Sequence, residues 1–250
     1  MRGSIVWLSE HDFPDAFPPV TGALREPDGL LAAGGDLSVP RLLAAYRRGI
    51  FPWYSRGQPI LWWCPDPRAV LFPDQLKTSR SLTKSIRNKG FETRMDTDFS
   101  AVIQACGSTE LRPGGTWLSP EMRSAYVNLH ELGYAHSVET WRGGELVGGL
   151  YGVALGQVFF GESMFSRERD ASKIALHRLC GELVGRGFHM IDCQMATPHL
   201  LSLGAQLIPR SEFIRQLTER TTLDTPSGAS PARWHVTTPA TDPAQQYTHK

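Results

Sequence analysis

Apolar and polar positions after residue 68 repeat in turn with the periods of strands and of helices. Short apolar runs and strict alternation predict strands, whereas apolar residues three and four positions apart predict amphipathic helices. The predicted elements are, in chain order, strand 69–72, helix 79–90, strand 91–96, helices 98–107 and 119–133, strands 134–141, 145–155 and 157–165, helix 171–187, strand 188–195, helix 199–205 and a closing segment 212–217. This order predicts a mixed α/β sheet whose central strands splay apart at a site.

Helix ends in this region carry clear signals. Ser79 or Ser81 can cap the helix that Gly90 ends, and Ser119 can cap the helix that has Pro120 in its first position. Residues 134–165 contain three strand patterns separated by short glycine-containing turns, which predicts an antiparallel meander.

The first 66 residues have a different pattern, rich in proline, glycine and aromatic residues. The stretch GLLAAGGDLS at 29–38 predicts a turn, followed by a helix at 41–49 that Ser38 caps, that tolerates Pro40 in its first turn and that Gly49 ends.

Prolines near residue 66 interrupt regular structure, so we predict a small N-terminal α/β domain at 1–66 and a larger domain at 67–220. Four aromatic residues crowd just before this junction, and they form either interdomain packing or one wall of a pocket between the domains. Residues 221–250 offer little to bury and are predicted to be disordered.

Composition narrows the functional classes. The 250 residues carry a formal net charge of +1, so a nucleic-acid partner would have to be bound by a local basic patch. No signal peptide and no membrane span is predicted, which favours a cytoplasmic protein without a membrane partner. The four cysteines form no CxxC pair and the histidines form no metal-binding spacing, so we expect no metal site.

A glycine-rich apolar stretch, LVGGLYGVALGQVFFGESMF, covers residues 146–165. Glycine weakens a strand interior relative to alanine, so several of them indicate that a ligand or another backbone approaches closely. Glu162 stands among aromatic and apolar neighbours, where a carboxylate is costly unless a partner is present. We therefore predict that this stretch forms the floor of a binding site and that Glu162 binds a cationic ligand.

A second candidate is the strand IDCQM, in which Asp192 and Gln194 share one face. Two polar side chains on one face of a buried strand need partners, either in a structural network or in the pocket. Glutamine cannot act as a conventional base but can orient an attacking amine, whereas Asp192 could accept a proton, directly or through water. No GxSxG motif or cysteine in a basic setting is present, so we expect no covalent intermediate.

Basic residues concentrate between residues 77 and 94, where Arg80, Lys84 and Arg87 fall on one helical face. Such a stripe is either a solvated helix face or a binding surface for a phosphate backbone. Trp117, beside two glycines, is either a core residue or a platform for a base or adenosine ring.

The order of strands and helices after residue 134 resembles the acetyltransferase fold of the GNAT type. In that fold a glycine-rich loop opens the long helix and binds the coenzyme A pyrophosphate. The corresponding segment here reads SRERDASK and lacks those glycines, which disfavours a coenzyme A site.

A more specific resemblance covers residues 8 to 217. The blocks GLLAAGGDL, AYRRGIFPWY, ILWWCPDPRAVLFP, TWLSPEM, HSVETW, LVGGLYGVALG, FGESMFSR, ASKIAL and IDCQ, in this order, resemble the bacterial leucyl/phenylalanyl-tRNA–protein transferase family. The resemblance implies a small N-terminal domain and a GNAT-like catalytic domain. It also implies transfer of Leu or Phe, less readily Met, from aminoacyl-tRNA to proteins with N-terminal Arg or Lys, which marks them for N-degron degradation.

The resemblance also assigns roles to residues. Asp192 and Gln194 correspond to the reacting-centre pair, Glu162 to the residue that binds the acceptor's N-terminal end, and Trp117 to the tryptophan that stacks on the terminal adenosine. The residues expected to line the pocket for the transferred side chain are Tyr46, Trp53, Leu150, Met164 and Ile191. Leu150 occupies a position where a well-studied member has methionine, which bears on side-chain preference and leaves the reaction unchanged.

An aminoacyl ester is already activated, so this reaction would need no ATP, metal or other cofactor. Two other functions fit parts of the sequence. A coenzyme-A-dependent N-acyltransferase would use the same fold, and a non-catalytic RNA- or peptide-binding module would use the basic face and the aromatic residues. A binding module of this kind would not explain why Asp192 and Gln194 are present.

Overall fold

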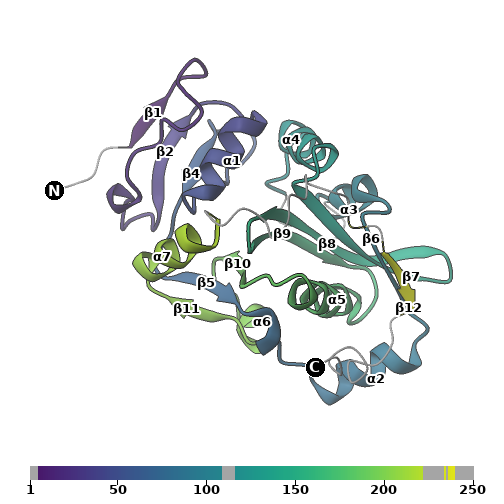
Figure 1. The fold of residues 1–250 in the computed structure, drawn as a ribbon. Helices are drawn as coiled ribbons and strands as arrows, with labels where there is room; N and C mark the ends of the chain where they lie inside the picture. The colour runs from purple at the N-terminus through teal and green to yellow at the C-terminus, as the bar shows by residue number, and fades with distance from the viewer. Residues whose placement is uncertain (1–4, 109–115, 222–233, 235, 240–250) are drawn as a thin grey trace.

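The computed structural model describes residues 5–108, 116–221, 234 and 236–239. Its strands form a four-stranded sheet in the order β1-β2-β4-β3 and an eight-stranded sheet in the order β11-β5-β10-β9-β8-β7-β6-β12. The small sheet uses residues 6–63, and the large one begins at residue 68 (Figure 1). The predicted mixed α/β fold, with a small N-terminal domain followed by a larger one, is confirmed. Within the described part of the chain, no helix combines the length and apolar character that crossing a bilayer would require.

The N-terminal sheet packs against one helix. Its elements are β1 (Val6–Leu8), β2 (Leu30–Gly34), α1 (Val39–Arg47), β3 (Phe51–Pro52) and β4 (Leu61–Trp63), together with a 3₁₀ turn at Val20–Gly22. The prediction of a turn at 29–38 is wrong for Leu30–Gly34, which is a strand parallel to β1 and antiparallel to β4. The reason is that this short apolar run is buried on both faces in the middle of the sheet, so it has no alternation to reveal a strand.

The ends of α1 were predicted with mixed success. Pro40 lies in its first turn and Gly49 follows its end with a φ of +71°, as expected. Ser38, in contrast, makes no side-chain cap. Asp36 stabilises the start of α1 instead. Its carboxylate accepts hydrogen bonds from the Ser38 backbone N–H (2.7 Å) and from Arg41 Nε (3.0 Å).

The large sheet contains the predicted strands and two that were not predicted. Its strands are β5 (Arg68–Leu71), β6 (Glu92–Met95), β7 (Ala135–Arg142), β8 (Glu145–Leu155), β9 (Val158–Ser166), β10 (Met190–Gln194), β11 (Gln206–Ile208) and β12 (Val236–Pro239). Its helices are α2 (Arg80–Asn88), α3 (Phe99–Cys106), α4 (Pro120–Glu131), α5 (Ala171–Gly185), α6 (Pro198–Ser202) and α7 (Arg210–Thr221), with a 3₁₀ turn at Pro73–Gln75. Ser79 and Ser119 cap α2 and α4 with their side chains, as predicted.

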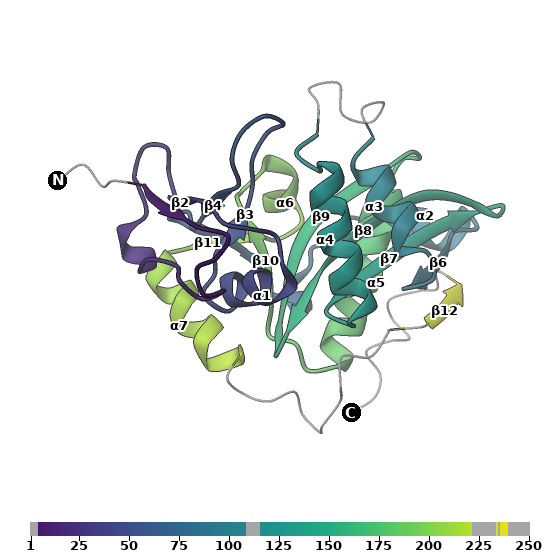
Figure 2. The ribbon, with the colours of Figure 1, turned by 90° about the horizontal axis from the view of Figure 1, so that it is seen from above.

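Helices cover both faces of the large sheet. A Cβ added to Gly148 would meet α5 at Ala171, whereas one added to its neighbour Gly149 would meet α3 at Val102, so α5 and α3 lie on opposite faces. Helix α4 packs with α3, and α7 packs beside α1 and the small sheet (Figure 2). The N-terminal unit therefore sits against the β5 side of the large sheet.

The two central strands separate partway along their length. β9 and β10 are parallel and pair from Met190–Val158 to Asp192–Phe160. Beyond that point β9 continues along β8 to Ser166, whereas the end of β10 pairs with β5. The predicted splay between central strands is thus present, and it opens the space in which the candidate site lies.

The expectation of a disordered tail after residue 220 is wrong for residues 221, 234 and 236–239. α7 extends to Thr221, and β12 pairs antiparallel with β6. The buried Trp234 stacks on His136 with ring centroids 3.9 Å apart, and its backbone N–H donates to Asp96 Oδ2 (2.6 Å). The buried ring of Trp234 and the pairing of β12 with β6 account for the ordered placement of these residues, although the composition around them is polar.

Candidate active site

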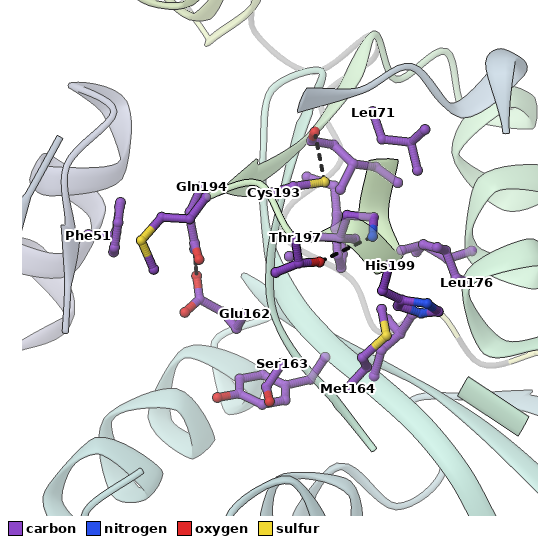
Figure 3. A pocket seen from close by; sticks show the side chains of 18 of the residues that line it. Phe51, Leu71, Glu162, Ser163, Met164, Leu176, Cys193, Gln194, Thr197 and His199 are labelled. Atoms are coloured by element: carbon purple, nitrogen blue, oxygen red, sulfur yellow. Dashed lines mark hydrogen bonds between the residues drawn. The ribbon is translucent and has the colours of Figure 1, made fainter. Parts of the chain in front are cut away.

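A cavity of about 380 Å³ lies between the splayed ends of β9 and β10. Residues of β3, β5, β8, β9, β10, α5 and α6 line it, so the small sheet and the large one both contribute. Figure 3 shows its two parts: the Gln194 and Glu162 side chains meet near Phe51, whereas Leu71, Leu176 and Met164 lie toward the other end. The cavity thus has a polar end and an apolar end.

The apolar end is built from the buried core around α5. Core side chains of β5, β8, β9, β10 and α5 close it, namely Leu71, Leu150, Phe159, Ile191, Leu176 and Leu179. Met164 and Trp53 add to this lining. Sequence reasoning missed the leucines at 71, 176 and 179 because they read as ordinary core positions. What makes them cavity residues is the separation of β9 from β10, which leaves their side chains without a packing partner on one side.

Three neutral donors surround Glu162 at the polar end. Its Oε1 accepts hydrogen bonds from the Tyr46 hydroxyl (2.8 Å) and from Gln194 Nε2 (3.1 Å), and its Oε2 accepts one from the Tyr126 hydroxyl (2.7 Å). The two tyrosine hydroxyls also lie 2.7 Å from each other. The buried carboxylate therefore has partners within the protein, because tyrosines of α1 and α4 donate uncharged hydrogen bonds to it.

The environment of Glu162 changes its acidity. Burial, together with the charge of Asp192, raises the pKa of its carboxyl to about 7 against the opposing hydrogen bonds from Tyr126, Tyr46 and Gln194. Burial and the nearby Glu162 charge also raise the pKa of Tyr46 and Tyr126, so both hydroxyls remain protonated donors. Glu162 can therefore gain or lose a proton near neutral pH.

Asp192 and Gln194 do not share a face. The β10–β5 register shifts between them, and Gln194 has a φ of +61°. This bulge breaks the alternation of a regular strand. Asp192 is fully buried and faces Arg68 of β5, whose Nε and Nη2 donate to its two carboxylate oxygens at 2.8 Å and 2.7 Å. Gln194 alone of the pair lines the cavity.

Most of the glycines between residues 148 and 161 admit neighbouring backbone, one of the two explanations that the sequence suggested, and line no ligand space. A Cβ on Gly148 would lie 2.5 Å from Ala171 Cβ, and one on Gly152 would lie 2.1 Å from the Phe160 carbonyl oxygen. Of the five glycines, Gly161 is the one that lines the cavity. The others allow α5 and neighbouring backbone to approach the sheet, so clearance for a ligand explains Gly161 at most.

The remaining predicted site residues divide into two groups. Trp53, Trp117, Leu150, Met164 and Ile191 line the cavity, as does Glu162. Tyr46 does not line it and instead lies buried behind Glu162. Arg80, Lys84 and Arg87 are exposed on α2, which packs against α5 and contributes no residue to the cavity lining.

A second, wider cleft adjoins the first. It has a volume of about 990 Å³ and lies between the N-terminal sheet and the start of α4. Trp117 lines both spaces, so this tryptophan stands where they meet. Tyr126, whose hydroxyl reaches Glu162, packs edge-on against the Trp117 ring at 6.5 Å.

Neither a metal centre nor an activated thiol is found near the cavity. Within the described ranges, no three His, Cys, Asp or Glu side chains gather in a way that could hold a metal ion. Cys193 lines the cavity, but burial raises the pKa of its thiol, which keeps it protonated at neutral pH. The other polar side chains that line the cavity include the Glu162 carboxylate, the Gln194 amide, the Ser163 and Thr197 hydroxyls and the His199 imidazole.

Comparison with known proteins identifies the family. Residues 70–218 match the family model described as leucyl/phenylalanyl-tRNA protein transferase, and residues 35–66 match its N-terminal domain. A leucyl/phenylalanyl-tRNA–protein transferase of Azoarcus sp. (strain BH72) is 59% identical over 236 residues, which cover 94% of this chain and 97% of the relative. One from Aromatoleum aromaticum is 60% identical over 230 residues, covering 92% of this chain and 94% of the relative. The chain belongs to the leucyl/phenylalanyl-tRNA–protein transferase family of aminoacyltransferases.

Proposed function

We propose that this chain transfers Leu or Phe, and less readily Met, from aminoacyl-tRNA to the α-amino group of proteins that begin with Arg or Lys. The observation that carries the proposal is the two-ended cavity, in which an apolar chamber opens next to the Glu162 carboxylate and the Gln194 amide. The apolar end suits the apolar side chain of a Leu, Phe or Met donor. The polar end suits a basic acceptor, because an ionised Glu162 there has no cation bonded to it within the described residues.

The reaction needs little beyond positioning. The ester of aminoacyl-tRNA is activated, and the acceptor's α-amine, with a pKa near ~8, is partly neutral at physiological pH. Holding the amine against the ester carbonyl removes most of the entropic barrier. The Gln194 amide and the Glu162 carboxylate lie at the junction of the two ends, where they can orient the amine. Glu162, with a pKa of about 7, can also accept the amine's proton and return it to the ribose oxygen of the tRNA, which leaves as a hydroxyl when the ester C–O bond breaks.

The tRNA would approach from the side where the two cleft spaces meet. Trp117 offers a ring on which the terminal adenosine can stack. The exposed cations of α2 are proposed to contact the phosphate backbone further along the tRNA. Because aminoacyl-tRNA is a cytoplasmic molecule in bacteria, we place the activity in the cytoplasm and its products in the N-degron pathway.

The decisive experiment mixes the protein with radiolabelled Phe-tRNA and peptides that start with Arg, Lys or Met. We expect label on the Arg and Lys peptides and none on the Met peptide. Parallel reactions with Leu-tRNA and Met-tRNA rank the donors, and acetyl-CoA tested as a donor addresses the alternative of a coenzyme-A-dependent enzyme. Label on all three peptides, or on none, would contradict the proposal.

The pKa of Glu162 gives a pH prediction. Its folded-state pKa is raised to about 7, so its carboxylate is lost as the pH falls through that value, and transfer should fall with it. The Tyr126 hydroxyl lowers this pKa by donating to the carboxylate, so Tyr126→Phe should move the acidic limb to higher pH. The measurement is the rate of transfer against pH at saturating Phe-tRNA.

The α-amine of the free peptide also loses reactivity as the pH falls, but Tyr126→Phe does not change its pKa. A shift of the acidic limb of the pH–rate profile therefore reports a titrating group of the enzyme. Tyr134→Phe is a matched control, because that tyrosine packs against the core without bonding to Glu162. Identical limbs for wild type and Tyr126→Phe would argue against Glu162 as the titrating group.

The tRNA-binding role of α2 predicts a change in salt dependence. Reversing Arg80, Lys84 and Arg87 to glutamate should weaken tRNA binding and reduce the slope of log affinity against log salt by about 2 to 3. Filter binding or fluorescence anisotropy between low and moderate salt measures it. The control reverses Arg215, an exposed α7 cation that is ion-paired with Glu212 and Glu219. An unchanged slope in the α2 variant would exclude that helix face as the contact.

A further inference from the structure

Arg68 is a buried cation that neither the sequence motifs nor the family assignment gives a role. Arg68 belongs to β5, and its side chain is fully buried. Its Nε and Nη2 donate two parallel hydrogen bonds, of 2.8 Å and 2.7 Å, to the Asp192 carboxylate. This two-pronged geometry is the strongest arrangement available to a guanidinium and a carboxylate. Asp192 therefore faces the Arg68 guanidinium and does not line the cavity.

Aromatic rings from two other parts of the molecule enclose the same guanidinium. The Phe51 ring of β3 lies 4.9 Å from its central carbon, and the Phe213 ring of α7 lies 4.5 Å from it. The N-terminal sheet, the large sheet and α7 therefore converge on Arg68. A longer or shorter side chain would not fill this space in the same way, because the stacked planar group is specific to arginine.

Asp192 connects Arg68 to the cavity through the backbone of Gln194. Its Oδ1, besides binding Arg68, accepts a hydrogen bond from the Gln194 backbone N–H at 2.9 Å. Gln194 has a φ of +61°, a conformation that residues other than glycine seldom adopt without support. The same residue then reaches Glu162 with its side-chain amide at 3.1 Å. The chain of contacts runs from Arg68 through Asp192 and the Gln194 backbone to the polar end of the cavity.

We propose that Arg68 is a positioning residue for aminoacyl transfer, which acts through Asp192 to hold Gln194 in its left-handed conformation and thereby aims the amide at Glu162. The inference rests on the proposed function. It also gives Asp192 a different role from the proton acceptor that the sequence suggested. A carboxylate locked by a bidentate arginine and directed away from the cavity fixes geometry and takes no proton from the amine.

The test is a set of variants assayed by single-turnover transfer of Phe from Phe-tRNA to an Arg-peptide. Arg68→Met should lower the rate at saturating substrates about 100-fold, as expected for loss of alignment at the reacting centre. The KM for Phe-tRNA should stay within about twofold, because the apolar end of the cavity does not include Arg68. Arg68→Lys should fall between Arg68→Met and wild type, since an ammonium cannot reproduce the two-pronged contact.

A matched control separates positioning from stability. Arg41 is likewise buried and bonded to a carboxylate, Asp36, but lies in the N-terminal unit. Arg41→Met should lower the melting temperature and leave the transfer rate per folded molecule unchanged. If Arg68→Met leaves Asp192 uncompensated and prevents folding, the double variant Arg68→Met/Asp192→Asn removes both charges, and its rate should also be low.

Wild-type rates in Arg68→Met, or in the folded double variant, would overturn the inference. So would an equal loss of rate in Arg41→Met. A wild-type protein that transfers no Phe would instead overturn the proposed function, so the two failures are distinguishable.

Discussion

Replacing Glu162 by glutamine should reduce kcat/KM for transfer to Arg- and Lys-peptides by about 100-fold. The positive charge of the bound acceptor would then be buried without a counter-charge, which costs about 2 to 5 kcal/mol. Glutamine keeps the shape of the side chain and one acceptor oxygen, which can replace either the acceptor of Tyr46 or that of Tyr126. The substitution removes the negative charge that would bind a cationic N-terminus. It also removes the carboxylate that could accept a proton from the acceptor's amine. The measurement is transfer from saturating Phe-tRNA at a pH above 7, where Glu162 is ionised in the wild type.

A second buried carboxylate provides the control for this substitution. Glu139 of β7 accepts hydrogen bonds from the Ser137 and Thr97 hydroxyls and lies outside the cavity. Glu139→Gln should therefore affect stability without affecting the choice of acceptor. The role of Glu162 would be refuted if Glu162→Gln discriminated between Arg- and Met-peptides as well as the wild type does.

Replacing Gln194 by alanine should lower the rate of transfer about 100-fold while the protein still folds, because the amide that orients the amine is lost. The amide contributes one hydrogen bond to Glu162 and lines the cavity at the junction of its two ends. Single-turnover assays with Phe-tRNA and an Arg-peptide measure the loss, and circular dichroism checks the fold.

The backbone at this position calls for a companion variant. Alanine is strained at a φ of +61°, whereas glycine adopts it readily, so Gln194→Gly removes the amide without that strain. Both variants should lose activity to a similar extent if the amide is what matters. Full activity in Gln194→Gly would show that the conformation of the backbone, and not the side chain, is required.

Much of the large domain could be predicted from the sequence because its signals are local. The meander at 134–165 shows alternation and short turns, and Ser79 and Ser119 are followed by helical periodicity. β2 was missed because an entirely buried strand has no alternation, and Trp234 because a lone tryptophan in a polar tail has no periodic pattern around it.

The candidate site was predicted in part, and its gaps have a common cause. Glu162 and Gln194 are polar residues within apolar strand patterns, so the sequence alone marks them as candidate site residues. Arg68 and Tyr126 become important only through partners that lie 124 and 36 residues away, Asp192 and Glu162 respectively. The bulge that turns Asp192 away from Gln194 depends on β5, which local pattern cannot supply.

The strand formed by residues 236–239 has a consequence for how molecules of this protein meet one another. An open sheet edge offers unpaired N–H and C=O groups to any other exposed strand, which is a route to self-association. Here β12 covers β6, and the two outermost strands of the large sheet, β11 and β12, have only three and four residues. β12 ends at Pro239, a residue that cannot donate to a further strand. β12 thus shields β6 from edge-to-edge pairing, and a chain shortened before residue 236 would leave the edge of β6 open to other molecules.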